Sequence, residues 1–253
     1  KYGINMSLRI RLILPILIIL FAVFLRFYKF EDFVTFLGDQ GRDAIVIKRI
    51  VTFEHFSAIG APSSLGQIFL GPFYYYLISP FLLLFNFNPV GLAFGVALIS
   101  LVGIIISYFI VKKETDYLTG LIFLIFTSFS SINIQFSRFS WNPNLLPVFS
   151  FFTLYFFYKT ISTKAKLFAI LFGAFLSFSV QLHHLAFLLL IPILLFNIFY
   201  LYTRLRSHSG KSRAKSRDAS RIVAGFWSRF APQNDIKNLI VSTVSFLFFS
   251  LPL

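Results

Sequence analysis

A short polar stretch, residues 37–43 (Leu-Gly-Asp-Gln-Gly-Arg-Asp), holds the side chains best suited to chemistry in this chain. Asp39, Arg42 and Asp43 are spaced i, i+3 and i+4, so a helix through this stretch would gather them on one face. A carboxylate in a partly desolvated site has a raised pKa, which suits proton abstraction. Asp39 and Asp43 are therefore candidates for a catalytic base and its partner. An interfacial Asp39–Arg42 ion pair behind a helix cap is the structural alternative.

The composition around this stretch is that of a membrane protein. The chain has 253 residues, of which 57% are hydrophobic, and its mean hydropathy is +0.81. Soluble domains are about 45–50% apolar, and several stretches here exceed the roughly 20 residues that cross a bilayer. The absence of cysteine excludes disulfides and thiolate sites. The net charge of +14 lies in loops, so it indicates membrane orientation rather than nucleic-acid binding.

The apolar pattern predicts an all-α, polytopic transmembrane helical bundle that forms a single module over residues 1–253. The seven predicted spans are residues 8–27, 90–111, 117–134, 145–158, 167–181, 185–202 and 238–253. A long outer loop at residues 28–89 contains juxtamembrane helices, and a basic cytoplasmic loop occupies residues 203–237. Because the sequence begins with Lys1 and ends inside an apolar run, we expect a C-terminally truncated chain.

Residues 69–85 are apolar, yet Pro72 and Pro80 interrupt them. If this segment does not cross the membrane, 17 of the 23 Lys and Arg residues fall on the inner side; if it crosses, only four do. The positive-inside rule favours the first arrangement. We therefore expect a cytoplasmic N-terminus, Lys112 and Lys113 in the cytoplasm, and residues 69–85 in or dipping into the outer leaflet.

With this arrangement of membrane crossings, three polar segments of the chain lie on the outer side, where we expect them to converge on one cavity. Arg138 beside Trp141 could pair with phosphate oxygens or could anchor the chain at the headgroup layer. His183 and His184 could face a phosphate. As a metal site they are a poor pair, because adjacent helical residues point about 100° apart.

Several short motifs resemble those of the membrane-embedded glycosyltransferases of the GT-C class. Residues 38–43 (Gly-Asp-Gln-Gly-Arg-Asp) resemble the Gly-Asp element that opens the first outer loop of that class. Residues 65–76 resemble a Pro-Pro-Leu-Tyr-Tyr-type juxtamembrane segment, and residues 137–144 resemble an Arg-bearing turn after the third span. More narrowly, the pattern is similar to the branch with protein O-mannosyltransferases and lipid A aminoarabinose transferases. That branch often has an acid where this chain has Gln40.

The resemblance implies transfer of a sugar from a polyprenyl-phosphate donor to a glycan, lipid or protein acceptor on the extracytoplasmic face, with inversion. It implies Asp39 as base with Asp43 beside it, in a multi-pass protein of the cytoplasmic membrane. The residues expected at the donor phosphate are Arg42, Arg138, His183 and His184. The residues expected to line the substrate cavity are Gln40, Tyr74, Tyr75, Trp141, Asn142 and Asn144.

We expect no required cofactor and no bound metal, although a divalent ion is an alternative. Two other functions would also use a polytopic membrane protein. A transporter or lipid flippase also places charges at membrane depth, but such proteins tend to carry internal repeats. A polysaccharide polymerase or ligase shares the lipid-linked donor but lacks the early Gly-Asp motif.

Overall fold

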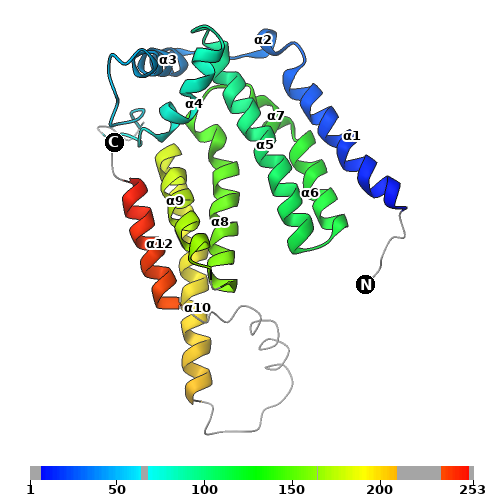
Figure 1. The fold of residues 1–253 in the computed structure, drawn as a ribbon, viewed down its shortest axis with the longest axis vertical. Coiled ribbons are helices and arrows are strands. Elements are labelled where there is room, and N and C mark those ends of the chain that lie inside the picture. Colours follow the sequence, from blue (N-terminus) through cyan, green and yellow to red (C-terminus); the bar gives the residue numbers. More distant parts are fainter. Residues whose placement is uncertain (1–6, 64–67, 164, 210–234, 251–253) are drawn as a thin grey trace. The chain divides into compact units, whose positions relative to one another are not determined.

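The computed structural model describes residues 7–63, 68–163, 165–209 and 235–250, which are helical apart from their connections. Two isolated β-bridges occur in this described part, and no strand does. Contacts divide the chain after Val148 into two compact units, and the expectation of a single module stays a prediction. The expectation of an all-α bundle of apolar helices is confirmed (Figure 1).

The helices up to Val148, here unit 1, are α1 (Leu8–Phe27), α2 (Phe30–Phe33), α3 (Gly38–Val51), α4 (Phe73–Leu84), α5 (Val90–Glu114), α6 (Tyr117–Phe129), α7 (Ser131–Ser137) and the 3₁₀ turn η1 (Asn142–Leu145). Those that follow are α8 (Leu146–Ser162), α9 (Lys166–Leu182), the 3₁₀ turn η2 (His184–Leu189), α10 (Leu190–Ser209) and α12 (Asp235–Ser250). All of these from Phe149 onward belong to unit 2.

One hydrophobic core cluster of unit 1 lies between α1, α5 and α6. Its fully or nearly buried side chains are Ile18, Ile104, Tyr108, Leu121 and Leu124. Each helix therefore turns one strip of apolar residues towards its neighbours, and the remaining apolar residues stay exposed on the outside of the unit. Such exposure suits a helix whose surroundings are lipid rather than water.

Basic residues mark one end of this helix group. Arg11 of α1 and Lys112 of α5 both lie over the ring of Tyr117, the first residue of α6, at 5.7 and 5.6 Å from its centroid. The start of α1 and the end of α5 therefore lie together, and α3 lies across the opposite end of the unit (Figure 1). This arrangement supports the prediction that the chain between α1 and α5 makes no net crossing.

The segment predicted not to cross forms α4, which has 12 residues. At 1.5 Å per residue it is about 18 Å long, shorter than the roughly 30 Å hydrocarbon core. It packs tightly on the start of α5, where a Cβ added to Gly91 would lie 2.4 Å from the carbonyl oxygen of Phe81. Non-crossing remains a prediction, and the length of α4 favours it.

Among the residues that the structure describes, three helices are long and apolar enough to cross a membrane: Leu8–Phe27, Val90–Glu114 and Asn142–Ser162. A fourth crossing is available if Tyr117–Phe129 and Ser131–Ser137, which are bent by 57°, form one broken span. The helices at the other predicted spans, including Lys166–Leu182, are apolar but shorter. The number of seven spans thus stays a prediction. Most of the predicted basic loop at residues 203–237 lies outside the described residues.

Unit 2 is held by close contact between α9 and α12. A Cβ at Gly173 would lie 2.3 Å from the carbonyl oxygen of Ser242, so only glycine allows this approach. The Ser245 hydroxyl donates to the carbonyl of Ile170 at 2.7 Å, and Gln181 Nε2 donates to the carbonyl of Phe249 at 2.7 Å. These bonds satisfy polar groups that lipid could not.

Candidate active site

The polar stretch identified first in the sequence forms the start of α3. The N-cap residue, Leu37, has no side-chain oxygen to bind the free amides of the first turn. Instead, its own amide donates to Gln40 Oε1 at 2.8 Å, which is one half of a capping box. Gln40 is buried, and its Nε2 has no hydrogen-bond partner in the described part of the chain. Gln40 thus fixes the start of the helix that carries the two carboxylates.

One arginine joins those carboxylates. Arg42 Nη1 donates to Asp39 Oδ1 at 2.8 Å, while its Nε and Nη2 donate to Asp43 Oδ1 at 2.9 and 2.8 Å. The side chains of Asp39, Arg42 and Asp43 are 53%, 32% and 0% exposed, respectively. The triad therefore runs from a buried carboxylate through a half-buried cation to an accessible carboxylate.

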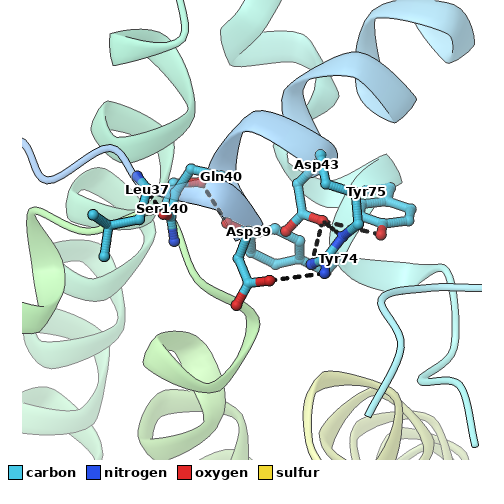
Figure 2. A network of polar contacts seen from close by, with 8 residues as sticks. Leu37, Asp39, Gln40, Asp43, Tyr74, Tyr75 and Ser140 are labelled. Atoms are coloured by element: carbon cyan, nitrogen blue, oxygen red, sulfur yellow. Dashed lines mark hydrogen bonds and ion pairs between the residues drawn. The ribbon is translucent and has the colours of Figure 1, made fainter. Parts of the chain in front are cut away.

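The buried carboxylate is also held from α4, which packs against α3. The Tyr75 hydroxyl donates to Asp43 Oδ1 at 3.1 Å, as Figure 2 shows, and Asp43 Oδ2 is buried without a partner among the described residues. Burial raises the pKa of Asp43, although the hydrogen bonds and charge of Arg42 and the Tyr75 hydroxyl oppose that rise. Asp43 is thus positioned to orient its neighbours rather than to meet a substrate.

The neighbouring tyrosines of α4 make separate connections. The Tyr74 hydroxyl lies 2.7 Å from Ser140 Oγ, which ties α4 to the turn after α7 (Figure 2). The Tyr76 hydroxyl donates to the carbonyl of Ser57 at 2.9 Å, which ties α4 to the loop after α3. Tyr74 and Tyr75 are buried in the chain as it stands, so their predicted place on a cavity wall stays a prediction.

Arg138, predicted at the donor phosphate, contacts the end of α1. Its Nε donates to the carbonyl of Arg26 at 3.1 Å, its Nη2 donates to the carbonyl of Leu25, and its guanidinium stacks on Phe33. Cations are favoured at helix C-termini, where the last carbonyls lack partners. In this structure Arg138 is therefore a helix cap, and a role at a phosphate would use its remaining N–H groups.

The turn that follows Arg138 carries the other predicted cavity residues. Trp141 is partly exposed and its ring lies 5.8 Å from that of Phe139, whereas Asn144 Nδ2 donates to the carbonyl of Phe139 at 2.7 Å. Asn142 is buried, and both polar atoms of its amide lack partners in the described part of the chain. A buried, unpaired amide costs free energy, so Asn142 is the member of this turn that most needs a ligand or water.

His183 and His184 belong to unit 2, between α9 and η2. His183 Nδ1 accepts from the amide of Leu185 at 3.1 Å, and desolvation together with His184 lowers the pKa of His183. His184 Nε2 is buried without a partner among the described residues. Their role at the donor phosphate stays a prediction. No group of three His, Asp or Glu side chains able to hold a metal ion occurs within the residues that the structure describes.

Two polar residues with long-range contacts in this region, Arg26 and Ser140, were not predicted from the sequence as site residues. Arg26 is fully buried at the end of α1 and donates to the carbonyls of Thr127 and Ser128, which end α6, at 3.2 and 3.1 Å. Ser140 is the partner of Tyr74. An arginine in the last turn of an apolar helix is a signal for capping, but its partners about 100 residues away leave no trace in local sequence.

Comparison with known proteins identifies a family for this sequence. The profile of the dolichyl-phosphate-mannose-protein mannosyltransferase family matches residues 70–215, which is more than half of the chain. The matched part includes α4 and the Arg138 turn, whereas the Asp39–Arg42–Asp43 triad precedes it. Neither a curated protein nor a solved structure matches the chain. The chain belongs to the dolichyl-phosphate-mannose-protein mannosyltransferase family.

Proposed function

We propose that the protein is a membrane glycosyltransferase that moves a sugar from a polyprenyl-phosphate donor to an acceptor hydroxyl on the extracytoplasmic face, with inversion. The family supports the class of reaction and the class of donor. A lipid-linked donor has to be met at the membrane, and α3 lies at one end of a group of apolar helices (Figure 1). The family match favours this enzyme over a transporter.

The reaction is a single displacement at the anomeric carbon. The acceptor oxygen forms the new bond from the face opposite the phosphate, while the bond between the anomeric carbon and the phosphate oxygen breaks. The electron pair leaves with the polyprenyl phosphate. The acceptor proton passes to a carboxylate of the protein, which acts as general base.

One observation carries the choice of base: the two carboxylates differ completely in exposure, 53% for Asp39 against 0% for Asp43. Among the described residues, only Arg42 donates to the Asp39 side chain, and it does so at Oδ1, so Oδ2 is left to accept a proton. Asp43 accepts two hydrogen bonds from Arg42 and thereby fixes its guanidinium. We assign Asp39 as the base and Asp43 as its support.

The same triad limits the part that Arg42 can take. Three of its N–H groups are committed to carboxylates, so the triad carries a net charge of −1 when both acids are ionised. Arg42 is therefore better placed to orient Asp39 than to neutralise the leaving phosphate. Arg138 supplies positive charge at the end of α2, where it stacks on Phe33. We keep it as a phosphate ligand through its uncommitted N–H groups.

The direct test is transfer of radiolabelled sugar from polyprenyl-phosphate donors by the purified protein in detergent or in liposomes, with and without EDTA. We expect transfer from at least one such donor and no loss of rate with EDTA, because the base chemistry needs no metal. A heat-treated sample and the Asp39→Asn variant are the controls. Abolition of transfer by EDTA, restored by a divalent cation, would show that a metal is required. Absence of transfer from every donor would contradict the proposed function.

A further inference from the structure

Tyr75 lies at the buried end of a chain of contacts that reaches the proposed base. Its hydroxyl donates to Asp43 Oδ1, the same oxygen that accepts from Nε and Nη2 of Arg42. Arg42 in turn donates to Asp39 through Nη1. The contacts cross from α4 to α3, so a residue of one helix can set the orientation of a carboxylate on the other (Figure 2).

We propose that Tyr75 is a positioning residue, which through Asp43 and Arg42 holds Asp39 in the orientation needed to take the acceptor proton. This inference rests on the proposed function, because it presumes that Asp39 is the base. The contact works only while Asp43 is ionised. A protonated Asp43 accepts hydrogen bonds less strongly, so its two hydrogen bonds from Arg42 weaken. The Arg42 guanidinium is then no longer held in place, and it no longer fixes the orientation of Asp39.

Within the described residues, the titratable groups that act on Asp43 come from two helices. Arg42 and Asp39 lie on its own helix, and Tyr75 and Tyr74 face it from α4. Of these, Arg42 and Tyr75 donate hydrogen bonds to it, whereas the negative charge of Asp39 favours its protonation. Burial already raises the pKa of Asp43, and loss of the Tyr75 donor would raise it further. Acid should therefore inactivate a Tyr75→Phe variant at a higher pH than it inactivates the wild type.

The experiment compares Tyr75→Phe with Tyr76→Phe. Each removes one phenol hydroxyl from α4 and leaves the ring, but the lost acceptor is the Asp43 carboxylate in one case and the Ser57 carbonyl in the other. We expect Tyr75→Phe to lower kcat roughly tenfold, the value of one hydrogen bond to a charged group. KM for the donor should stay unchanged, and the acid limb of the pH profile should move to higher pH. Tyr76→Phe should leave both kcat and the profile as in the wild type.

A double variant tests whether Tyr75 acts through Asp43. If it does, adding Tyr75→Phe to Asp43→Asn should produce no further loss of kcat, whereas independent effects would multiply. Multiplying effects would overturn the proposal, as would an unchanged pH profile in Tyr75→Phe. A raised donor KM with unchanged kcat would also overturn it, because Tyr75 would then be a substrate contact.

A readout that needs no turnover separates this proposal from the proposed function. Infrared titration of the buried carboxyl, assigned by subtraction of the Asp43→Asn spectrum, should show protonation at higher pH in Tyr75→Phe than in the wild type or Tyr76→Phe. An unchanged titration would contradict the Tyr75–Asp43 contact itself. If the titration shifts as expected while Asp39→Asn retains full turnover, the contact stands and the assignment of the base fails.

Discussion

Two carboxylates four residues apart on α3 have different roles because the fold gives them different surroundings. Asp39 is half exposed and accepts a hydrogen bond from Arg42 at one carboxylate oxygen, whereas Asp43 is fully buried and accepts three hydrogen bonds at a single oxygen. A buried, well-bonded carboxylate is a good orienting group and a poor proton acceptor for an incoming substrate. Spacing alone could place both acids on one face, but it could not rank them.

The ranking predicts how conservative variants will behave. Asp39→Asn is nearly isosteric and removes the proton acceptor, so we expect kcat to fall by about 10²–10⁴-fold, the usual loss with a general base. Donor binding and folding should be retained. Steady-state kinetics, donor binding and size-exclusion profiles of the purified variant measure these three properties.

Asp43→Asn serves as the comparison within the same helix. It should reduce kcat less than Asp39→Asn does, because the base itself is left in place. It should also lower stability, since the Arg42 fork loses its charged acceptor. Near wild-type turnover of Asp39→Asn together with an inactive Asp43→Asn would show that the two carboxylates have been assigned in the wrong order.

At the scale of elements, the apolar runs predicted the helices well. The first predicted span, residues 8–27, coincides with α1, and the span at residues 90–111 lies within α5. Long apolar segments have few alternatives in lipid, since every backbone group must be paired within the segment. The division into two units and the bend after Phe129 were not predicted, because they depend on packing between distant helices.

Helix ends were harder to predict than helix interiors. Arg26 and Arg138 cap the last carbonyls of α6 and α1, respectively, with bonds that join residues more than 100 positions apart. From the sequence alone, Arg138 next to an aromatic turn indicated a phosphate or headgroup ligand. Both readings rest on the same chemistry, because the exposed carbonyls of a helix end carry partial negative charge as a phosphate carries full charge.

The buried cap predicts a stability effect at the ends of α1 and α6. Replacing Arg26 with Met removes the arginine donor from the buried carbonyl of Ser128, whereas the carbonyl of Thr127 keeps Asn133 Nδ2 at 3.4 Å. An unsatisfied buried acceptor costs about 1–3 kcal/mol. We expect Arg26→Met to lower the free energy of unfolding by about 2 kcal/mol, measured by denaturant titration in detergent micelles.

Arg49→Met, on the exposed face of α3, is the matched control for loss of a cation and should stay within about 0.5 kcal/mol of the wild type. An Arg26→Met variant more stable than the wild type would contradict the capping interpretation. It would mean that the free-energy cost of burying the cation exceeds the stabilisation from its hydrogen bonds.

At the scale of the whole molecule, charge and geometry agree on how unit 1 is arranged. Arg11 and Lys112 meet at Tyr117, at one end, while the Asp39–Arg42–Asp43 triad lies on α3, across the opposite end (Figure 1). The positive-inside rule assigns the first end to the cytoplasm. A donor sugar would then meet the triad on the extracytoplasmic side.

The absence of cysteine makes this orientation directly measurable, because any introduced cysteine is the only thiol in the chain. Lys113 and His55 are both exposed, and the prediction places them on opposite sides of the membrane. In intact cells an impermeant maleimide should label His55→Cys but not Lys113→Cys. After permeabilisation it should label both. Labelling of both variants in intact cells would mean that α4 crosses the membrane, and labelling of Lys113→Cys alone would mean that the whole unit is inverted, with the triad on the cytoplasmic side.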